Sequence, residues 1–349
     1  MSWDQIVQEA KNEREVTFLG FYGENFFKEA AARFKDKYGI DVRVVIGDQA
    51  ANNDKVLAEK DRTIGTIDTL MVGGIQVKTT MDADVWYGPI FQKLPAFNQL
   101  DQQLGSYQEG VETKGYLVPL WRNQTMFLYD PERVANPPQT WDEFTAWVNA
   151  NPKGFAYSDP NKGGTGSAFV QTVISNLTGG IDKYKGDTEV DPAKVANWTL
   201  AWDWLRANNP KMNVTLSNSE STDLLNQGAA SLVVAWEDEA IAALSTGTLF
   251  KRAKSYIPSM GLPGGGDTAG VLKNAPHKAA ALLFLDFLTT AEIQELMNQI
   301  LGATPARTDI TNYSTLVPED QRQKNATTWL PAAYKADYAK GYTQHVLLQ

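Results

Sequence analysis

Three short apolar runs near the start of the chain decide the fold class: VTFLGF at residues 16–21, VRVVI at 42–46 and IDTLMV at 67–72. Runs of this length and apolar content are typical of strands that are covered on both faces. The segments between them, residues 26–38 and 55–62, are predicted helices. Strands that alternate with helices form βαβ units, so we predict a parallel sheet flanked by helices and an α/β fold.

The loops that follow the first and third runs are the first candidate ligand sites. In parallel α/β sheets, ligands bind outside the carboxyl ends of the strands, which here are residues 21–25 and 73–76. Glu24 can pair with a cationic group of a ligand, or it can only complement the dipole of the helix that it opens. The candidate residues in these loops are Tyr22, Gly23, Glu24 and Gly74.

The composition excludes several classes of function. The chain has 349 residues, a length that suggests two domains. Its 32 basic and 41 acidic side chains give a net charge of −9, which argues against binding to nucleic acid or to an anionic membrane surface. The chain has no cysteine and only two histidines, His277 and His345. A thiolate site and a multi-histidine metal site therefore cannot form, and we expect neither a metal nor a cofactor.

The start of the chain and its apolar runs bear on its location. No run of about 18 apolar residues is present, so we expect no membrane-spanning helix. The sequence opens Met1-Ser2-Trp3 without a recognisable signal peptide. We therefore expect either a cytosolic protein or a mature chain whose leader has been removed.

A glycine-rich stretch, GGTGS at residues 163–167, precedes a predicted helix over residues 168–177. Hydroxyls and free N–H groups at a helix N-terminus can hold an anionic head group such as phosphate, phosphonate or carboxylate, and the glycines permit a close approach to the backbone. The same side chains can instead be ordinary helix caps. The candidates here are Thr165, Gly166 and Ser167.

An acidic stretch follows the predicted buried strand at residues 231–236. Trp236 at the end of this strand can stack on a ring, a sugar or a quaternary amine, and Glu237 and Asp238 can bind a cation. The alternative is a solvated acidic helix start behind a core tryptophan. Glu237 together with Asp238 or Glu239 could also form the carboxylate pair of a hydrolytic enzyme.

Two further positions carry candidate residues. Residues 117–129 contain two apolar stretches around a polar middle, which suggests a crossing between domains. There, Arg122 can hold a carboxylate or phosphate through two parallel hydrogen bonds, or it can form a salt bridge at the crossing. Arg307 is open to a binding or a structural interpretation in the same way. The candidates are Trp121, Arg122, Asn123 and Arg307.

Several stretches resemble the type II extracellular (periplasmic) solute-binding proteins of ABC importers. The strands and helices over residues 16–72 are similar to the opening of that family, and LNQGAASLVVAW at 225–236 is similar to its segment before a ligand-stacking tryptophan. KNAPHKAAA at 273–281 and GATPAR at 302–307 resemble its C-terminal signatures. By this resemblance, the nearest subgroup binds polyamines, thiamine, ferric iron or phosphonates.

The resemblance implies a two-lobed fold. Each lobe would be a mostly parallel sheet flanked by helices, with a ligand cleft between the lobes that closes when the ligand contacts both. The implied division of the chain is residues 1–120 and 259–303 for lobe 1, residues 125–255 and 306–349 for lobe 2, and crossings near 119–125, 256–260 and 302–307.

The resemblance also implies a function. The chain would be a monomeric receptor, periplasmic or extracellular, that captures a small polar solute and delivers it to the membrane permease of an ABC importer. We expect an anion-bearing solute of the phosphate or phosphonate type, held at residues 165–167. A cationic solute such as thiamine or a polyamine, held by Glu24, Glu237 and Asp238, is one alternative. A sensor built on the same clamp and an α/β hydrolytic enzyme are the others.

Overall fold

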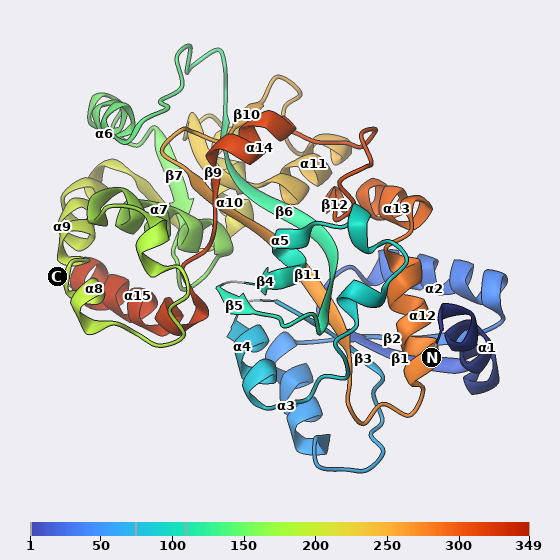
Figure 1. Ribbon diagram of the computed structural model, residues 1–349. Helices are drawn as coiled ribbons and strands as arrows, with labels where there is room; N and C mark the ends of the chain where they lie inside the picture. Colours follow the sequence, from blue (N-terminus) through green and yellow to red (C-terminus); the bar gives the residue numbers. More distant parts are fainter. Residues whose placement is uncertain (1, 74, 109, 349) are drawn as a thin grey trace. The chain divides into compact units, whose positions relative to one another are not determined.

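The computed structural model describes residues 2–73, 75–108 and 110–348, and the chain divides into two compact units (Figure 1). Unit 1 consists of Met1–Arg122 and Gly266–Tyr313, and unit 2 consists of Asn123–Gly265 and Ser314–Gln349. The chain therefore passes from one unit to the other three times. The first two passages lie within the long strands β6 (Leu117–Tyr129) and β11 (Leu262–Val271). None of the helices in the described part of the chain has the length and apolar character needed to cross a bilayer.

Unit 1 is built on a sheet in the order β2-β1-β3-β11. Strand β1 (Glu15–Gly20) pairs in parallel with β2 (Asp41–Ile46) and with β3 (Thr69–Val72), whereas β11 runs antiparallel to β3. The three strands predicted from the apolar runs are confirmed, and so is their parallel arrangement. The antiparallel strand comes from a segment almost 200 residues further along the chain, and the βαβ pattern at the start carries no sign of it.

One helix of unit 1 begins earlier than predicted. In place of the helix expected at residues 55–62, the structure has α3 (Gln49–Glu59), because the Asp48 side chain accepts a hydrogen bond from the backbone N of Ala51 at 2.9 Å and starts the helix there. The other elements of unit 1 are α1 (Trp3–Glu13), α2 (Glu24–Tyr38), α4 (Ile75–Asp82), α5 (Gln102–Ser106), β4 (Tyr107–Gln108), β5 (Val111–Glu112), α12 (Lys278–Leu288), α13 (Ala291–Leu301) and β12 (Thr304–Pro305).

Aromatic side chains hold the helices of unit 1 to its sheet. Phe18 of β1 contacts Phe27 of α2 and Phe284 of α12, with ring centroids 4.2 and 5.9 Å apart, and all three rings are fully buried. Burying a side chain of this size contributes roughly 1.5–3 kcal/mol. Helix α12, drawn in orange, thus packs among the blue elements from the start of the chain (Figure 1).

Unit 2 has a sheet in the order β6-β9-β7-β8. Strands β9 (Leu232–Trp236), β7 (Phe155–Ser158) and β8 (Asn213–Thr215) are parallel, and β6 runs antiparallel to β9. The carboxyl ends of the three parallel strands therefore lie at one edge of the sheet. After each of them a helix begins within a few residues: α11 (Glu237–Thr246) after β9, α7 (Gly164–Thr178) after β7 and α10 (Asn218–Asn226) after β8.

The core of unit 2 is also aromatic. Phe127 of β6, Phe144 of α6 and Phe155 of β7 are fully buried, and their ring centroids lie 4.9–5.6 Å apart. The red C-terminal helix α15 lies among the green helices of this unit (Figure 1). The remaining elements are α6 (Trp141–Ala150), α8 (Pro192–Ala196), α9 (Thr199–Asn208), β10 (Lys254–Tyr256), α14 (Glu319–Asn325), β13 (Ala326–Thr327) and α15 (Lys335–Tyr342).

Candidate functional site

Side-chain hydrogen bonds hold the N-terminus of α7 against the ends of two neighbouring strands. Asn218, the first residue of α10, accepts through its Oδ1 from Thr165 N at 3.1 Å and from Thr165 Oγ1 at 2.9 Å. The Oγ of Ser158, the last residue of β7, accepts from Gly166 N at 2.8 Å. The first N–H groups of a helix have no partner within the helix, so these two side chains act as its cap.

The glycines before and within this helix start are needed for the close packing. A Cβ atom on Gly166 would lie 1.8 Å from the backbone oxygen of Ser158, and one on Gly163 would lie 2.4 Å from Asn218 Oδ1. Contacts this short do not occur between real atoms, so any other residue would push α7 away from the strand ends. The glycines thus admit the protein's own capping groups to the backbone.

The three residues predicted to hold an anion are brought together here, with their polar groups already engaged. Thr165 is fully buried, and both its N–H and its hydroxyl are hydrogen bonded. Ser167 donates from its Oγ to a backbone carbonyl at 3.0 Å. An anion that bound the N–H groups of Thr165 and Gly166 would have to displace the acceptors that they now have.

Trp236, at the end of β9, forms a partly exposed aromatic surface. Its ring lies 5.9 Å from the ring of Trp329, with an interplanar angle of 35°. The backbone of Gly164 packs so closely on the indole that an added Cβ would lie 2.9 Å from a ring carbon. The indole is therefore fixed by its neighbours while part of its surface stays available for stacking.

Glu237, the first residue of α11, is only 1 % exposed and lies in a dense set of internal bonds. It accepts from Arg322 Nη2 at 2.7 Å, from Thr315 Oγ1 at 2.6 Å, and from the backbone N of Leu316 and of Val317 at 2.8 and 3.1 Å. Removing either charge of a buried ion pair leaves the other uncompensated. Glu237 thus fixes residues 315–322, which belong to the C-terminal segment of the chain in unit 2.

Asp238 and Asn123, two candidates that lie far apart in the sequence, form a hydrogen bond through their side chains. Asp238 also accepts from the backbone N of Glu239 at 2.9 Å. It is 6 % exposed, and burial raises the pKa of its carboxyl, although the hydrogen bond from Asn123 works against that increase. The structure thus brings these two predicted residues together beside the start of α11.

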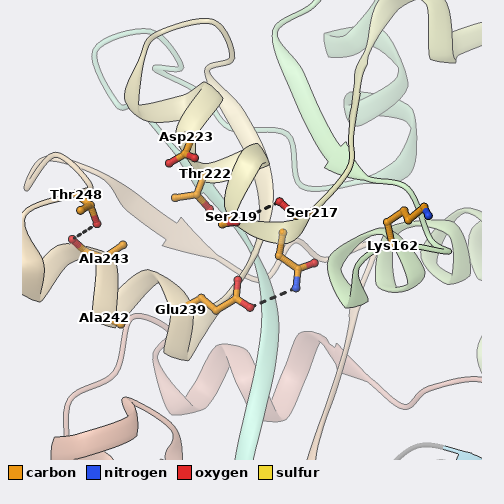
Figure 2. Close-up of a pocket in the computed structure, with 10 residues that line it drawn as sticks. Lys162, Ser217, Ser219, Thr222, Asp223, Glu239, Ala242, Ala243 and Thr248 are labelled. Atoms are coloured by element: carbon orange, nitrogen blue, oxygen red, sulfur yellow. Dashed lines mark hydrogen bonds between the residues drawn. The ribbon is translucent and has the colours of Figure 1, made fainter. Parts of the chain in front are cut away.

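Glu239 faces a pocket of about 420 Å³ within unit 2, between α10 and α11 (Figure 2). Its Oε1 accepts from Asn218 Nδ2 at 3.3 Å. The side chain is exposed to the pocket, yet the surrounding protein raises its pKa to about 7, first by desolvation and then by repulsion from Asp238. Other residues that line the pocket are Lys162, Ser217, Ser219, Thr222, Asp223, Ala242, Ala243 and Thr248.

Three consecutive acids at the start of α11 thus have three different surroundings: Glu237 faces Arg322, Asp238 faces Asn123 and Glu239 faces the pocket. The reason is the helix itself, which turns by about 100° per residue. The same periodicity, applied to the sequence, could have separated Glu239 from Glu237 as a ligand candidate. Within the described ranges, no group of three or more His, Cys, Asp or Glu side chains is placed to hold a metal ion.

In unit 1, the candidates after β1 lie at the start of α2. Gly23 is the N-cap and has a φ of +79°, and the side chain of Glu24 forms an ion pair with Lys28 at 2.6 Å. The Tyr22 ring is 42 % exposed and meets the buried Trp121 ring edge-on, with centroids 6.3 Å apart. Tyr22 is therefore the candidate in this loop that offers open aromatic surface.

The remaining candidates of unit 1 make contacts with its own backbone and side chains. Trp121 donates from Nε1 to Asp267 Oδ2 at 2.9 Å, and Arg122 donates from Nε to a backbone carbonyl at 2.8 Å. Arg307 forms two parallel hydrogen bonds with the carboxylate of Asp309, at 2.9 and 2.6 Å. Gly74 lies outside the described residues. Binding roles for these residues stay predictions.

Solved structures of several binding proteins share this fold. An extracellular solute-binding protein from Bordetella parapertussis matches with a TM-score of 0.77 and 15 % identity, over 95 % of this chain and 99 % of that chain. The spermidine/putrescine ABC transporter substrate-binding protein PotD from Streptococcus pneumoniae gives a TM-score of 0.73 and 14 % identity, over 96 % and 99 %. The periplasmic binding protein AfuA from Actinobacillus pleuropneumoniae, solved with fructose-6-phosphate, gives 0.64 and 15 %, over 96 % and 99 %.

These likenesses establish that the predicted α/β fold is that of the two-lobed periplasmic binding proteins. At identities this low, a structural likeness does not identify the ligand. Among curated proteins, none matches the sequence. The family profile of bacterial extracellular solute-binding proteins matches residues 29–328, which is most of the chain. The chain therefore belongs to the family of bacterial extracellular solute-binding proteins.

Proposed function

We propose that this protein is the solute-binding component of an ABC importer, which captures a small polar solute in the periplasm or outside the cell and delivers it to a membrane permease. Family membership supports the binding role. The observation that carries the proposal is the pocket between α10 and α11, which lies at the carboxyl ends of parallel strands and is lined by hydroxyl, amide and charged groups. Sites of this kind hold small ligands in α/β folds.

The contacts bear on which solutes are candidates. An anion at Thr165–Ser167, the class expected from the sequence, has less support because Asn218 and Ser158 already accept from the N–H groups there. The acidic residues Asp223 and Glu239, which line the pocket, support a solute with positive charge. The names of the structural relatives include both classes, a spermidine/putrescine binder and a protein solved with a sugar phosphate.

Native mass spectrometry of freshly purified protein tests the proposal, since a tightly held solute adds its mass to that of the chain. A panel of anionic, cationic and neutral metabolites in a thermal-shift assay then ranks the classes. A solute at a hundred times its Kd stabilises the folded state by about 2.7 kcal/mol. If no mass is retained and no compound raises the melting temperature, the binding role fails.

Two other roles predict different results. A sensor would bind a solute but would be captured by a membrane receptor in a pull-down, whereas the proposed role predicts capture by a permease. A hydrolytic enzyme would convert the bound solute. Incubation of the retained solute with the protein, followed by mass analysis, should return the solute unchanged. If a product forms and Glu239→Gln abolishes its formation, the protein is an enzyme and not a transport component.

A further inference from the structure

The pocket between α10 and α11 combines open volume with charge. Its volume of about 420 Å³ falls within the range of small-molecule sites. Ala242 and Ala243 face it from α11, and their short side chains leave the space open. In Figure 2, Glu239 from α11 and Thr222 and Asp223 from α10 border the same space.

The charges around the pocket are unequal. Asp223 and Glu239 contribute two carboxylates, and Lys162 contributes one ammonium group. The side chain of Lys162 extends away from the Glu239 carboxylate (Figure 2). Across the residues that the structure describes, neither Lys162 nor Asp223 has a side-chain hydrogen bond or an ion pair. The lining of the pocket therefore carries more negative than positive charge, which favours a positive group.

Glu239 is poorly compensated when it is ionised. Its carboxylate has one side-chain donor, Asn218 Nδ2, at a long 3.3 Å, and Asp238 beside it adds repulsion. An ionised carboxylate can accept about four hydrogen bonds, so Glu239 can accept further donors from a ligand in the pocket. A donor that also carries positive charge would supply what the carboxylate lacks.

We propose that this pocket binds a primary ammonium group of the solute against the Glu239 carboxylate, with Asp223 adding negative charge elsewhere on the pocket wall. The inference rests on the proposed function and names the chemical class of the solute. A primary ammonium group has three N–H donors on a compact charge, so it can donate to the Glu239 carboxylate while it neutralises the charge there. A phosphate or carboxylate would instead be repelled by both acids.

Binding of the ammonium group is linked to the loss of a proton from the Glu239 carboxyl. The ligand binds the ionised form of Glu239, whose pKa of about 7 means that a large part of the protein carries a proton there at neutral pH. Binding then releases that proton to solvent. The groups around Glu239 are Asp238 on α11, Asn218 and Asp223 on α10 and Lys162 before α7, and none of these is a histidine that could produce the same dependence.

Three four-carbon probes test the inference by isothermal titration calorimetry at pH 6, 7 and 8: 1,4-diaminobutane, 1,4-butanediol and succinate. We expect the diamine to bind more tightly than the diol and succinate at every pH. Its affinity should rise about tenfold from pH 6 to pH 8, since below its pKa the ionised fraction of a carboxyl falls towards tenfold per pH unit. Tighter binding of succinate, or no binding of the diamine, overturns the inference.

Variants complete the test. Glu239→Gln keeps the shape of the side chain, and we expect it to weaken diamine binding at least tenfold and to remove the pH dependence. Glu189→Gln, an exposed glutamate of the same unit that does not line the pocket, changes the net charge equally and should leave both unchanged. Equal diamine affinity in Glu239→Gln and the native protein contradicts the proposal. A retained solute without an amine refutes this inference and leaves the importer function standing.

Discussion

Two helix starts in unit 2 have the same place in the fold and opposite chemistry. Helix α7 begins after β7 with glycines and hydroxyls, and α11 begins after β9 with three acids. At α7, Asn218 and Ser158 occupy the N–H groups that an anion would use. At α11, one acid is neutralised internally while Glu239 borders open space. Position at a strand end is therefore not enough to identify a binding group; the side chains opposite it decide what remains available.

The largest effect should come from Glu237, the acid of this comparison that faces inward. Glu237→Gln removes the buried counter-charge of the Arg322 guanidinium, which keeps only the more exposed Glu319 at 3.6 Å, and we expect it to lower the free energy of unfolding by about 3 kcal/mol. Urea denaturation measures this difference. Glu239→Gln, the same chemical change two residues further on, should cost less than about 1 kcal/mol; equal losses in the two variants would show that both acids are structural.

The next effect concerns the close approach of α7 to β7. Gly166→Ala places a methyl group 1.8 Å from the backbone oxygen of Ser158, so helix and strand must separate, and we expect a loss of about 2–3 kcal/mol. Gly164→Ala meets only the edge of the Trp236 ring, at 2.9 Å, and should cost less. In an open helix alanine would be the better residue by about 1 kcal/mol. A Gly166→Ala variant that melts higher than the native protein would therefore rule out the packing described here.

Asn218 links the two helix starts, since its oxygen caps α7 and its amide donates to Glu239. Asn218→Ala should lower stability by about 1 kcal/mol, as expected for the loss of a cap. It should also raise the pKa of Glu239 further, because the hydrogen bond that favours the charged form is lost. NMR titration of the side-chain carboxyl carbons follows this pKa, with Glu239→Gln to assign the signal. A lowered pKa would contradict the assigned contact.

The smallest effect is a pH dependence of stability. The pKa of Glu239 is about 7 in the folded protein and near 4.5 in an unfolded chain, so the folded state binds the proton more tightly. Stability should therefore fall as pH rises from about 4.5 to 7. The carboxylate is exposed to the pocket, and solvent limits the change to about 1 kcal/mol or less. Thermal melts of the native protein and of Glu239→Gln measure it; parallel curves for the two would show that Glu239 does not titrate in this range.

Local patterns in the sequence predicted the parts of the fold that depend on near neighbours. The apolar runs at residues 16–21, 42–46 and 67–72 correspond to β1, β2 and β3, because burial on both faces requires apolar residues at consecutive positions. The α/β fold, predicted from these runs, is confirmed. The family resemblance, which rests also on residues 225–236, 273–281 and 302–307, is confirmed as well. The start of α3 was misplaced, since a single capping contact from Asp48 decides it.

The contacts of the candidate site could not be predicted in the same way, because they join distant parts of the chain. Thr165 is capped by Asn218, 53 residues away, and Glu237 is paired with Arg322, 85 residues away. Neither partner carries a signal in its own neighbourhood of the sequence. The three acids at the start of α11 form one run in the sequence. Helical periodicity separates Glu237 from Glu239, but the partners around the helix decide which of the two is the structural acid.

A crystal structure of the protein purified with its retained solute would test the account most directly. We predict density for a small molecule in the pocket between α10 and α11, with a nitrogen atom within about 3 Å of a Glu239 carboxylate oxygen. The bonds from Asn218 and Ser158 to the start of α7 should be unchanged. A solute that instead placed an acidic group on the N–H groups of Thr165 and Gly166, with the pocket beside Glu239 unfilled, would contradict it.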